Sequence, residues 1–417
     1  MSTRIDRFKN EMAAGGSVKE NEPDEQPSRL TAVLGIGAWI VLFVVLAVIS
    51  PWMLVFVVGV LISIFLHEVG HFVTARRSGM KVTQFFMGFG PRIWSTHRDG
   101  VEYGVRAIPL GAFVRIIGMN NLDEVPPEDE AFTYRQASYP KRMLVITAGS
   151  LMHLIIAVVT IVGVYTFAGR VEETGQVKVF SVVENSPAAQ AGLEPGDVVL
   201  SVDGTAVTNS AQFRTTLSST APGTTVALQV LRDGTTFETD ATLVQSPAAA
   251  AGEQRGFLGV GSDSRDRVDQ SVGQALVKGP QDLVQGVGQA VVGIAKVLNP
   301  VNVFGHLTGT NTDETSRPTT LVGATRISDD FGQNDGWAGI LSLLAALNVS
   351  VAVFNMFPLL PLDGGHAAIA TYERLRERNG KRYFADVSKL MPVVTITVAL
   401  LAFMFLTGLY LDTMKGF

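Results

Sequence analysis

Cysteine is absent from this chain of 417 residues. Its absence excludes disulfide bonds, cysteine nucleophiles and thiolate metal sites, so histidine and carboxylate side chains are the ligands left for any metal. Charged residues are also scarce at 17%, whereas 47% of the residues are hydrophobic and the mean hydropathy is +0.28. This balance is typical of a membrane protein that carries soluble domains in its polar intervals.

A basic, aromatic-rich surface is also missing. The formal net charge is -5, so we expect no nucleic-acid partner. Many transporters are built from internal repeats, and this chain shows none. Residues 1–29 are mostly polar and contain Gly and Pro, which predicts a disordered tail and does not resemble a cleavable signal peptide.

Five apolar runs are long enough to cross a lipid bilayer as helices: residues 30–50, 53–74, 143–168, 340–360 and 391–411. Ten Lys or Arg lie in residues 75–142 and six in residues 367–390, whereas residues 170–339 hold eleven against nineteen Asp or Glu. By the positive-inside rule, the N-terminus and the two basic intervals are cytoplasmic, and residues 170–339 are extracytoplasmic.

These intervals predict the domain organisation. The tail of residues 1–29 precedes a membrane domain of residues 30–169, a β-rich soluble domain of residues 170–250 and a connecting segment of residues 251–339. A second membrane domain, residues 340–417, contains the Leu362-Asp363-Gly364 motif. Residues 274–307 favour amphipathic helices that either pack on the core or lie on the membrane.

Short β-rich runs separated by turns occur in two of the polar intervals. Residues 101–118 are rich in Val, Ile, Tyr and Phe and are interrupted by Gly104, Pro109 and Gly111, which predicts a β-hairpin or loop close to the membrane. An edge strand there could pair with an extended substrate, or the hairpin could be purely structural. Residues 177–243 carry the turn dipeptides Asp203-Gly204 and Asp233-Gly234.

The second apolar run ends in His67-Glu68-Val69-Gly70-His71. Ionisable side chains are costly at bilayer depth, so they indicate function. On a helix, His67 and His71 share a face and can bind one Zn²⁺, while Glu68 stands beside it as a general base. A structural histidine pair would give the same spacing, but such a pair is rare inside an apolar span.

A catalytic zinc ion typically takes three protein ligands and keeps one position open for water. Asp363 is the best third ligand, because it ends another apolar run on the same predicted side as His71. We expect Gly364 and Gly365 to allow a sharp turn there, although Asp363 could instead cap a helix. Zinc would activate a water molecule and Glu68 would accept its proton for attack on a peptide carbonyl.

These residues resemble a known family, the site-2 intramembrane metalloproteases, and within it the bacterial branch with a PDZ domain that cleaves membrane-bound anti-sigma factors. The matching stretches are residues 67–71, Gly88-Phe89-Gly90-Pro91, Tyr103-Gly104-Val105, Pro109-Leu110-Gly111 and the run from Asn355 through Pro358 and Pro361 to Asp363-Gly364-Gly365-His366. The PDZ segment is matched by Ser186-Pro187-Ala188-Ala189, Ala191-Gly192-Leu193 and Pro195-Gly196-Asp197. The resemblance covers residues 55–411.

The resemblance implies a polytopic α-helical membrane protein with about five transmembrane helices, a membrane-associated β-hairpin and an inserted extracytoplasmic PDZ-like α+β domain. It also implies a function: zinc-dependent cleavage within the transmembrane segment of a single-span, anti-sigma-factor-like protein. The cleavage would take place in the bilayer of a bacterial cell membrane, after a first protease has removed the outer domain of the substrate. Asn355 would position the substrate or stabilise the oxyanion, although a helix-packing amide also explains it.

One stretch departs from the family pattern. Where the family usually has Gly-Pro-x-x-Asn, this chain has Gly149-Ser150-Leu151-Met152-His153. The resemblance does not explain His153, and both a packing hydrogen bond and a functional role are open. The fourth apolar run contains a further polar residue, Asn348, in addition to Asn355.

Two other functions fit parts of the sequence. One is a membrane scaffold that binds peptide C-termini through its PDZ-like domain and holds a structural metal. The other is a metal or ion transporter, suggested only by the intramembrane His and Asp residues. A structural zinc is closed by four protein ligands, whereas this sequence offers three ligands and a general base. The sequence therefore favours the protease.

Overall fold

The computed structural model describes residues 29–119, 121–247, 249, 252–378 and 381–415. The tail predicted for residues 1–29 lies outside these ranges except for Arg29. The described residues divide into two compact units. One is Tyr165–Gln274, which we call the inserted domain, and the other, which we call the membrane unit, contains the remaining described residues.

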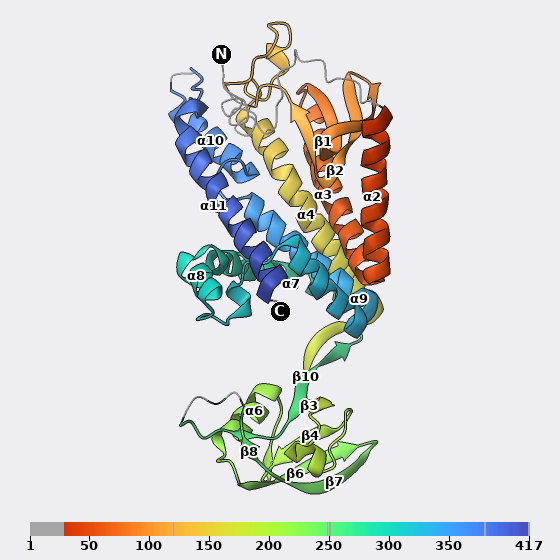
Figure 1. Ribbon diagram of the computed structural model, residues 1–417. Coiled ribbons are helices and arrows are strands. Elements are labelled where there is room, and N and C mark those ends of the chain that lie inside the picture. The colour runs from red at the N-terminus through yellow and green to blue at the C-terminus, as the bar shows by residue number, and fades with distance from the viewer. Residues whose placement is uncertain (1–28, 120, 248, 250–251, 379–380, 416–417) are drawn as a thin grey trace. The chain divides into compact units, whose positions relative to one another are not determined.

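Among the described residues, five helices are long and apolar enough to cross a membrane, in agreement with the five apolar runs of the sequence. They are α2 (Arg29–Ile49), α3 (Pro51–Arg77), α4 (Tyr139–Ala168), α9 (Leu321–Asn355) and α11 (Met391–Tyr410). A sixth span is possible if α7 (Val272–Leu298) and α8 (Pro300–Thr308), which meet at 63°, are counted together. Figure 1 shows α2 alongside α3.

The amphipathic segment after the inserted domain forms α7 and α8. Ala275 and Gly279 of α7 are buried, and a Cβ at Gly279 would lie 2.8 Å from Val162 of α4. Val284 and Val292 of α7 remain exposed. This helix therefore packs against the core on one side and keeps further apolar side chains on its surface.

The fourth predicted span and the helix observed in its place have different bounds. The sequence predicts residues 340–360, whereas α9 begins at Leu321, is interrupted at Gly336 (φ 58°, ψ -137°) and ends at Asn355. Pro358 and Pro361 explain the end of the helix, because proline lacks an N–H donor and disfavours helical geometry in the residue before it. The chain turns through residues 356–362 before α10 (Asp363–Arg376) begins.

Asp363 is consequently the first residue of α10 and not the last residue of an apolar span. Gly364 and Gly365 also act differently from our expectation, because neither has a positive φ. A Cβ at Gly364 would overlap the backbone of Met356, and one at Gly365 would overlap the backbone of Leu359. The two glycines thus permit close packing of α10 on the preceding turn.

Strands β1 (Val82–Arg98) and β2 (Val101–Ile116) form an antiparallel sheet in the membrane unit, in which each strand bends back on itself. Residues 84–87 pair with residues 102–105 on one side and with residues 112–115 on the other, while residues 92–98 pair with residues 101–106. Gly88, Gly90 and Gly111 have positive φ at the bends, which favours glycine. The sheet begins at Val82, whereas the sequence predicts the hairpin only in residues 101–118.

The sheet packs against the helices that carry the ionisable residues. A buried apolar cluster joins Phe85 and Val101 of the sheet to Ala75 of α3, Val145 of α4 and Ala367 of α10. In Figure 1, β1 and β2 lie beside α2 and α3. Burial of this shared apolar surface holds the sheet at the end of α3 where His71 lies.

The inserted domain has its own core and sheet. Its elements are β3 (Arg170–Val182), α5 (Pro187–Gln190), β4 (Val198–Val202), β5 (Thr205–Ala206), α6 (Ser210–Ser219), β6 (Thr225–Arg232), β7 (Thr235–Thr242), β8 (Val244–Gln245), β9 (Gly256–Phe257) and β10 (Val260–Val268). The main sheet has the order β10-β3-β4-β6-β7. Val179, Val199 and Phe213 lie in a buried apolar cluster, so the alternating β-rich runs form a true core.

The end of the inserted domain lies later than the predicted boundary at residue 250, because β10 pairs with β3 and extends this unit to Gln274. The pairing begins with Arg170 opposite Val268. The first and last strands of the domain along the chain are therefore neighbours, and the domain is a closed insertion between α4 and α7.

A carboxylate from the C-terminal end of the chain caps α9. Asp412 is fully buried and accepts hydrogen bonds from the N–H of Thr320 at 2.8 Å, the hydroxyl of Thr320 at 2.7 Å and the N–H of Gly323 at 3.2 Å. The first N–H groups of a helix have no partner within it, and an anion there also interacts favourably with the helix dipole. Asp412 therefore joins the start of α9 to the end of α11.

We expect Asp412→Ala to lower the free energy of unfolding by about 2 kcal/mol, since it leaves buried N–H donors without their acceptor. Thermal unfolding of the detergent-solubilised protein measures the change. Asp330→Ala, which removes an exposed carboxylate from α9, is the matched control. Equal unfolding temperatures for the two variants would show that Asp412 does not stabilise α9.

Candidate active site

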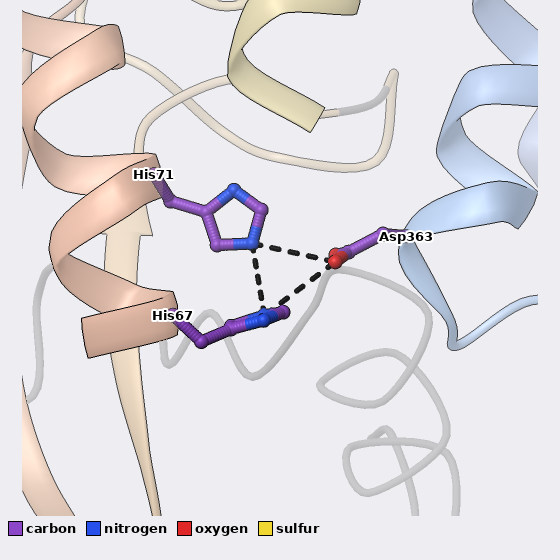
Figure 2. Close-up of side chains that lie close together, drawn as sticks. All are labelled: His67, His71 and Asp363. Atoms are coloured by element: carbon purple, nitrogen blue, oxygen red, sulfur yellow. Dashed lines mark hydrogen bonds and ion pairs between the residues drawn. The ribbon is translucent and has the colours of Figure 1, made fainter. Parts of the chain in front are cut away.

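Two helices bring three ligand atoms together. Helix α3 carries His67 and His71 one turn apart, and the first turn of α10 carries Asp363. Figure 2 shows the three side chains pointing toward one another. The Nε2 atoms of the histidines are 3.1 Å apart, and Oδ2 of Asp363 lies 3.5 Å from His67 Nε2 and 3.4 Å from His71 Nε2.

This geometry fits a zinc ion. Bonds of 2.0–2.1 Å to a tetrahedral Zn²⁺ place neighbouring ligand atoms about 3.3 Å apart, close to the three distances observed. His67 and His71 are buried, at 7% and 8% exposed, and their imidazole nitrogens face a carboxylate oxygen. Within the described part of the chain, this is the only group of three His, Cys, Asp or Glu side chains with all ligand atoms within 4.8 Å.

The imidazole of His71 is oriented from α4. Its Nδ1 lies 2.7 Å from the carbonyl oxygen of Val145, so Nδ1–H donates to that oxygen and leaves Nε2 with a free lone pair. A backbone acceptor of this kind fixes both the tautomer and the ring orientation of a metal-binding histidine. The hydrogen bond therefore prepares His71 to bind through Nε2.

Gly149, one turn after Val145 on α4, lies against both histidines. A Cβ at this position would overlap the imidazoles of His67 and His71. The glycine therefore allows the backbone of α4 to approach the two rings closely. This contact gives a physical reason for the glycine at the start of the Gly149-Ser150-Leu151-Met152-His153 stretch.

Glu68 lies beside the three ligand atoms but does not provide one of them. Its Oε1 is 3.9 Å from His67 Nε2, and its side chain is 14% exposed. The carboxylate also lies near the backbone of Val114 of β2. Glu68 is thus placed between the metal-binding group and the sheet, where it can act on a water molecule or a peptide.

A buried ion pair holds α10, and with it Asp363, against α4. Arg142 donates to Glu373, and both side chains are less than a tenth exposed. The second carboxylate oxygen of Glu373 accepts the N–H of Ala385 at 2.7 Å. Sequence reasoning missed this pair, because its members lie in or beside basic intervals where charged residues are unremarkable.

Asn355 is the last residue of α9 and is half-buried. Seven residues of the turn separate it from Asp363. Among the described residues, no hydrogen bond or ion pair joins Asn355 to His67, His71 or Asp363, so its role in substrate binding stays a prediction.

His153 is buried close to the ligand group. Its ring centroid is 4.9 Å from that of His67, and its Nδ1 is 2.7 Å from Oδ1 of Asn348. Sequence reasoning singled out His153 and noted Asn348 but did not connect them. The signal that could have linked them is that both are polar residues in apolar spans, where such groups usually find one another.

Comparison with known proteins agrees with this geometry. Residues 55–400 match the model of peptidase family M50. The zinc metalloprotease Rip1 of Mycobacterium tuberculosis is 34% identical over 390 residues, which cover 84% of this chain and 95% of that protein. Rip1 of Mycolicibacterium smegmatis is 32% identical over 389 residues, with the same two shares.

Among solved structures, the PDZ domain of an SdrC-like protein from Listeria monocytogenes is 26% identical and covers 21% of this chain and 87% of its own, with a TM-score of 0.19. The family match covers most of the chain and both Rip1 proteins match over nearly their whole length. The chain therefore belongs to peptidase family M50, the site-2 proteases, and is a multi-pass membrane zinc metalloprotease that cleaves within the bilayer.

Proposed function

We propose that His67, His71 and Asp363 hold the catalytic zinc ion and that Glu68 is the general base. The observation that carries this proposal is the convergence of two imidazole nitrogens and one carboxylate oxygen from α3 and α10, with 3.1 to 3.5 Å between them. Three ligands leave a fourth tetrahedral position for water or substrate, as in catalytic zinc sites.

A zinc ion held by His67, His71 and Asp363 would supply Lewis-acid chemistry for the peptide carbonyl and for the attacking water molecule. The residues of this chain supply the proton transfers. Glu68 stands outside the ligand group, so its carboxylate is available to accept a proton from the attacking water and to deliver one to the leaving amine nitrogen. Burial around His67 and His71 limits access of other water molecules to the reaction.

The substrate we propose is the transmembrane helix of a single-span membrane protein, of the anti-sigma-factor type, after a first cleavage. A helix hides its carbonyl groups in internal hydrogen bonds, so the substrate must unwind before attack. Residues 112–115 of β2 pair with residues 84–87 on one side, and the backbone of Val114 contacts Glu68. We infer that the unwound segment pairs with this edge of the sheet.

We also propose the orientation. The basic residues of intervals 75–142 and 367–390 favour the cytoplasmic side of a bacterial cell membrane for the sheet and for α10, with the N-terminus on that side. The inserted domain is then extracytoplasmic, and we propose that it is PDZ-like and discriminates cut from uncut substrates. A scaffold with a structural metal is less well supported, because a structural zinc is closed by four protein ligands, whereas the group found among the described residues has three.

Glu68→Gln should lower the cleavage rate of a single-span substrate by about a hundredfold or more, because an amide cannot accept the proton. Zinc content should stay at the wild-type value. Asp363→Ala, in contrast, should lose both zinc and activity. Cleavage assays in detergent, combined with metal analysis of the same samples, measure both quantities. A Glu68→Gln variant with normal zinc and an unchanged rate would disprove the general-base role.

Gly149→Ala should weaken zinc binding about tenfold or more, since the added methyl group would displace the imidazoles of His67 and His71. Gly163→Ala is the matched control, because the same change in the same helix meets no atom within 4 Å. Competition with a chelator of known zinc affinity measures the difference. Equal affinities for the two variants would contradict the close approach of α4.

Asn355→Ala should lower kcat by about a hundredfold, with zinc content and unfolding temperature unchanged, if Asn355 stabilises the oxyanion or orients the scissile carbonyl. Steady-state kinetics with the single-span substrate measures the effect. A normal kcat together with a lower unfolding temperature would assign Asn355 to helix packing instead.

A further inference from the structure

A polar network crosses three membrane helices next to the ligand group. It consists of His153 on α4, Asn348 on α9 and Ser63 on α3, which are 3%, 1% and 6% exposed. His153 Nδ1 is 2.7 Å from Asn348 Oδ1, and Asn348 Nδ2 is 3.1 Å from Ser63 Oγ. These residues are distant in sequence, so the network forms only when the three helices are packed together.

The direction of each hydrogen bond is fixed by the next one. The hydroxyl of Ser63 donates to the Gly59 carbonyl at 2.9 Å, so its oxygen accepts from Asn348. The same amide nitrogen donates to the Leu344 carbonyl at 2.7 Å. Both contacts require the NH₂ group, so the amide oxygen faces His153 and Nδ1 of His153 is the donor. The network is complete at each of these atoms, which holds the imidazole of His153 in one orientation.

His153 meets the ligand group through His67. Val145, Gly149 and His153 follow one another at intervals of four residues, so they lie on one face of α4. Val145 holds His71 by its carbonyl, Gly149 admits both imidazoles, and the ring of His153 stands 4.9 Å from that of His67. One face of α4 therefore contacts both histidines of α3.

His153 is not itself part of the metal-binding group. The described residues with ligand atoms within 4.8 Å of one another are His67, His71 and Asp363 alone. A catalytic zinc site also usually has three protein ligands and an open fourth position. A role for His153 must therefore act through its neighbour His67.

We propose that His153 is a positioning residue for His67, held in place by Asn348 and Ser63. The network fixes the ring of His153, and that ring restricts the rotation of His67 so that Nε2 faces His71 Nε2 and Asp363 Oδ2. The inference rests on the proposed role of His67 as a zinc ligand. Outer residues that orient metal ligands typically contribute about 10- to 100-fold to metal affinity.

The test uses the full-length protein in detergent and compares His153→Leu, Asn348→Leu and the double variant. Competition with a chelator gives zinc affinity, and kinetics of the zinc-saturated protein gives kcat and KM. We expect each single variant to bind zinc about 10- to 100-fold more weakly. The zinc affinity of the double variant should equal that of the single variant with the lower affinity, because the effects of residues that act as one unit are non-additive.

Two further variants keep the test decisive. His153→Phe retains a ring of similar size without the hydrogen bond, and it replaces His153→Leu in the test if that variant fails to fold. We expect His153→Phe to weaken zinc binding as well. Val349→Ala is the matched control, since it removes a buried side chain of α9 next to Asn348 and outside the network. We expect Val349→Ala to keep the wild-type zinc affinity and KM. In the network variants, KM should stay unchanged while kcat falls.

His67→Ala separates this inference from the proposed function. If His67→Ala loses zinc but Asn348→Leu and His153→Phe bind zinc as tightly as the wild type, His153 is a packing residue and the inference is wrong. A lower unfolding temperature with unchanged zinc affinity in the network variants would likewise assign His153 to packing. If His67→Ala keeps its zinc, the ligand assignment itself has failed, and the positioning role fails with it.

Discussion

The structure depends on the burial of three polar ligand atoms where the apolar helix α3 meets α10. Two imidazoles and a carboxylate at the interface of α3 and α10 would be costly without a shared cation, because each would lose its hydration without a full set of partners. The rest of the membrane unit can be understood as the support that this arrangement needs. Helix α4 contacts both histidines, and the buried pair of Arg142 and Glu373 fixes α10 against α4.

The support is asymmetric in its chemistry. His71 is held by a backbone carbonyl, a contact that any residue at position 145 could provide. His67 is bordered instead by a side chain, His153, which depends on Asn348 for its own orientation. The position of His71 is therefore built into the path of α4, whereas the surroundings of His67 depend on the residues present at two distant positions.

The sequence predicts the local part of this arrangement well. His67 and His71 lie one turn apart on any helix, so their shared face follows from spacing alone, and the five apolar helices follow from composition. Asp363 could be proposed as a partner, but its place at the start of α10 could not, because it depends on where Pro358 and Pro361 end the preceding helix. The early start of α9 was also missed, since residues 321–335 are too polar to be recognised as part of a span.

Non-local pairing accounts for most of what sequence reasoning missed. The double pairing of residues 84–87 depends on the bends at Gly88, Gly90 and Gly111, and strand register cannot be deduced from composition. The contacts of His153 with Asn348, and of Asp412 with Thr320, join residues 195 and 92 positions apart. Each is a polar residue visible in the sequence, but its partner is determined only by the packing of helices.

The pairing of Arg170 with Val268 has a consequence for how such a chain can change over evolutionary time. The polypeptide enters the inserted domain through β3 and leaves it through β10, and these two strands pair with each other. Their pairing brings together the two chain segments that connect the domain to α4 and α7. Residues between β3 and β10 can be inserted, deleted or replaced without changing the short segments that join these strands to α4 and α7. The inserted domain can therefore change in sequence and size separately from the chemistry of the membrane unit.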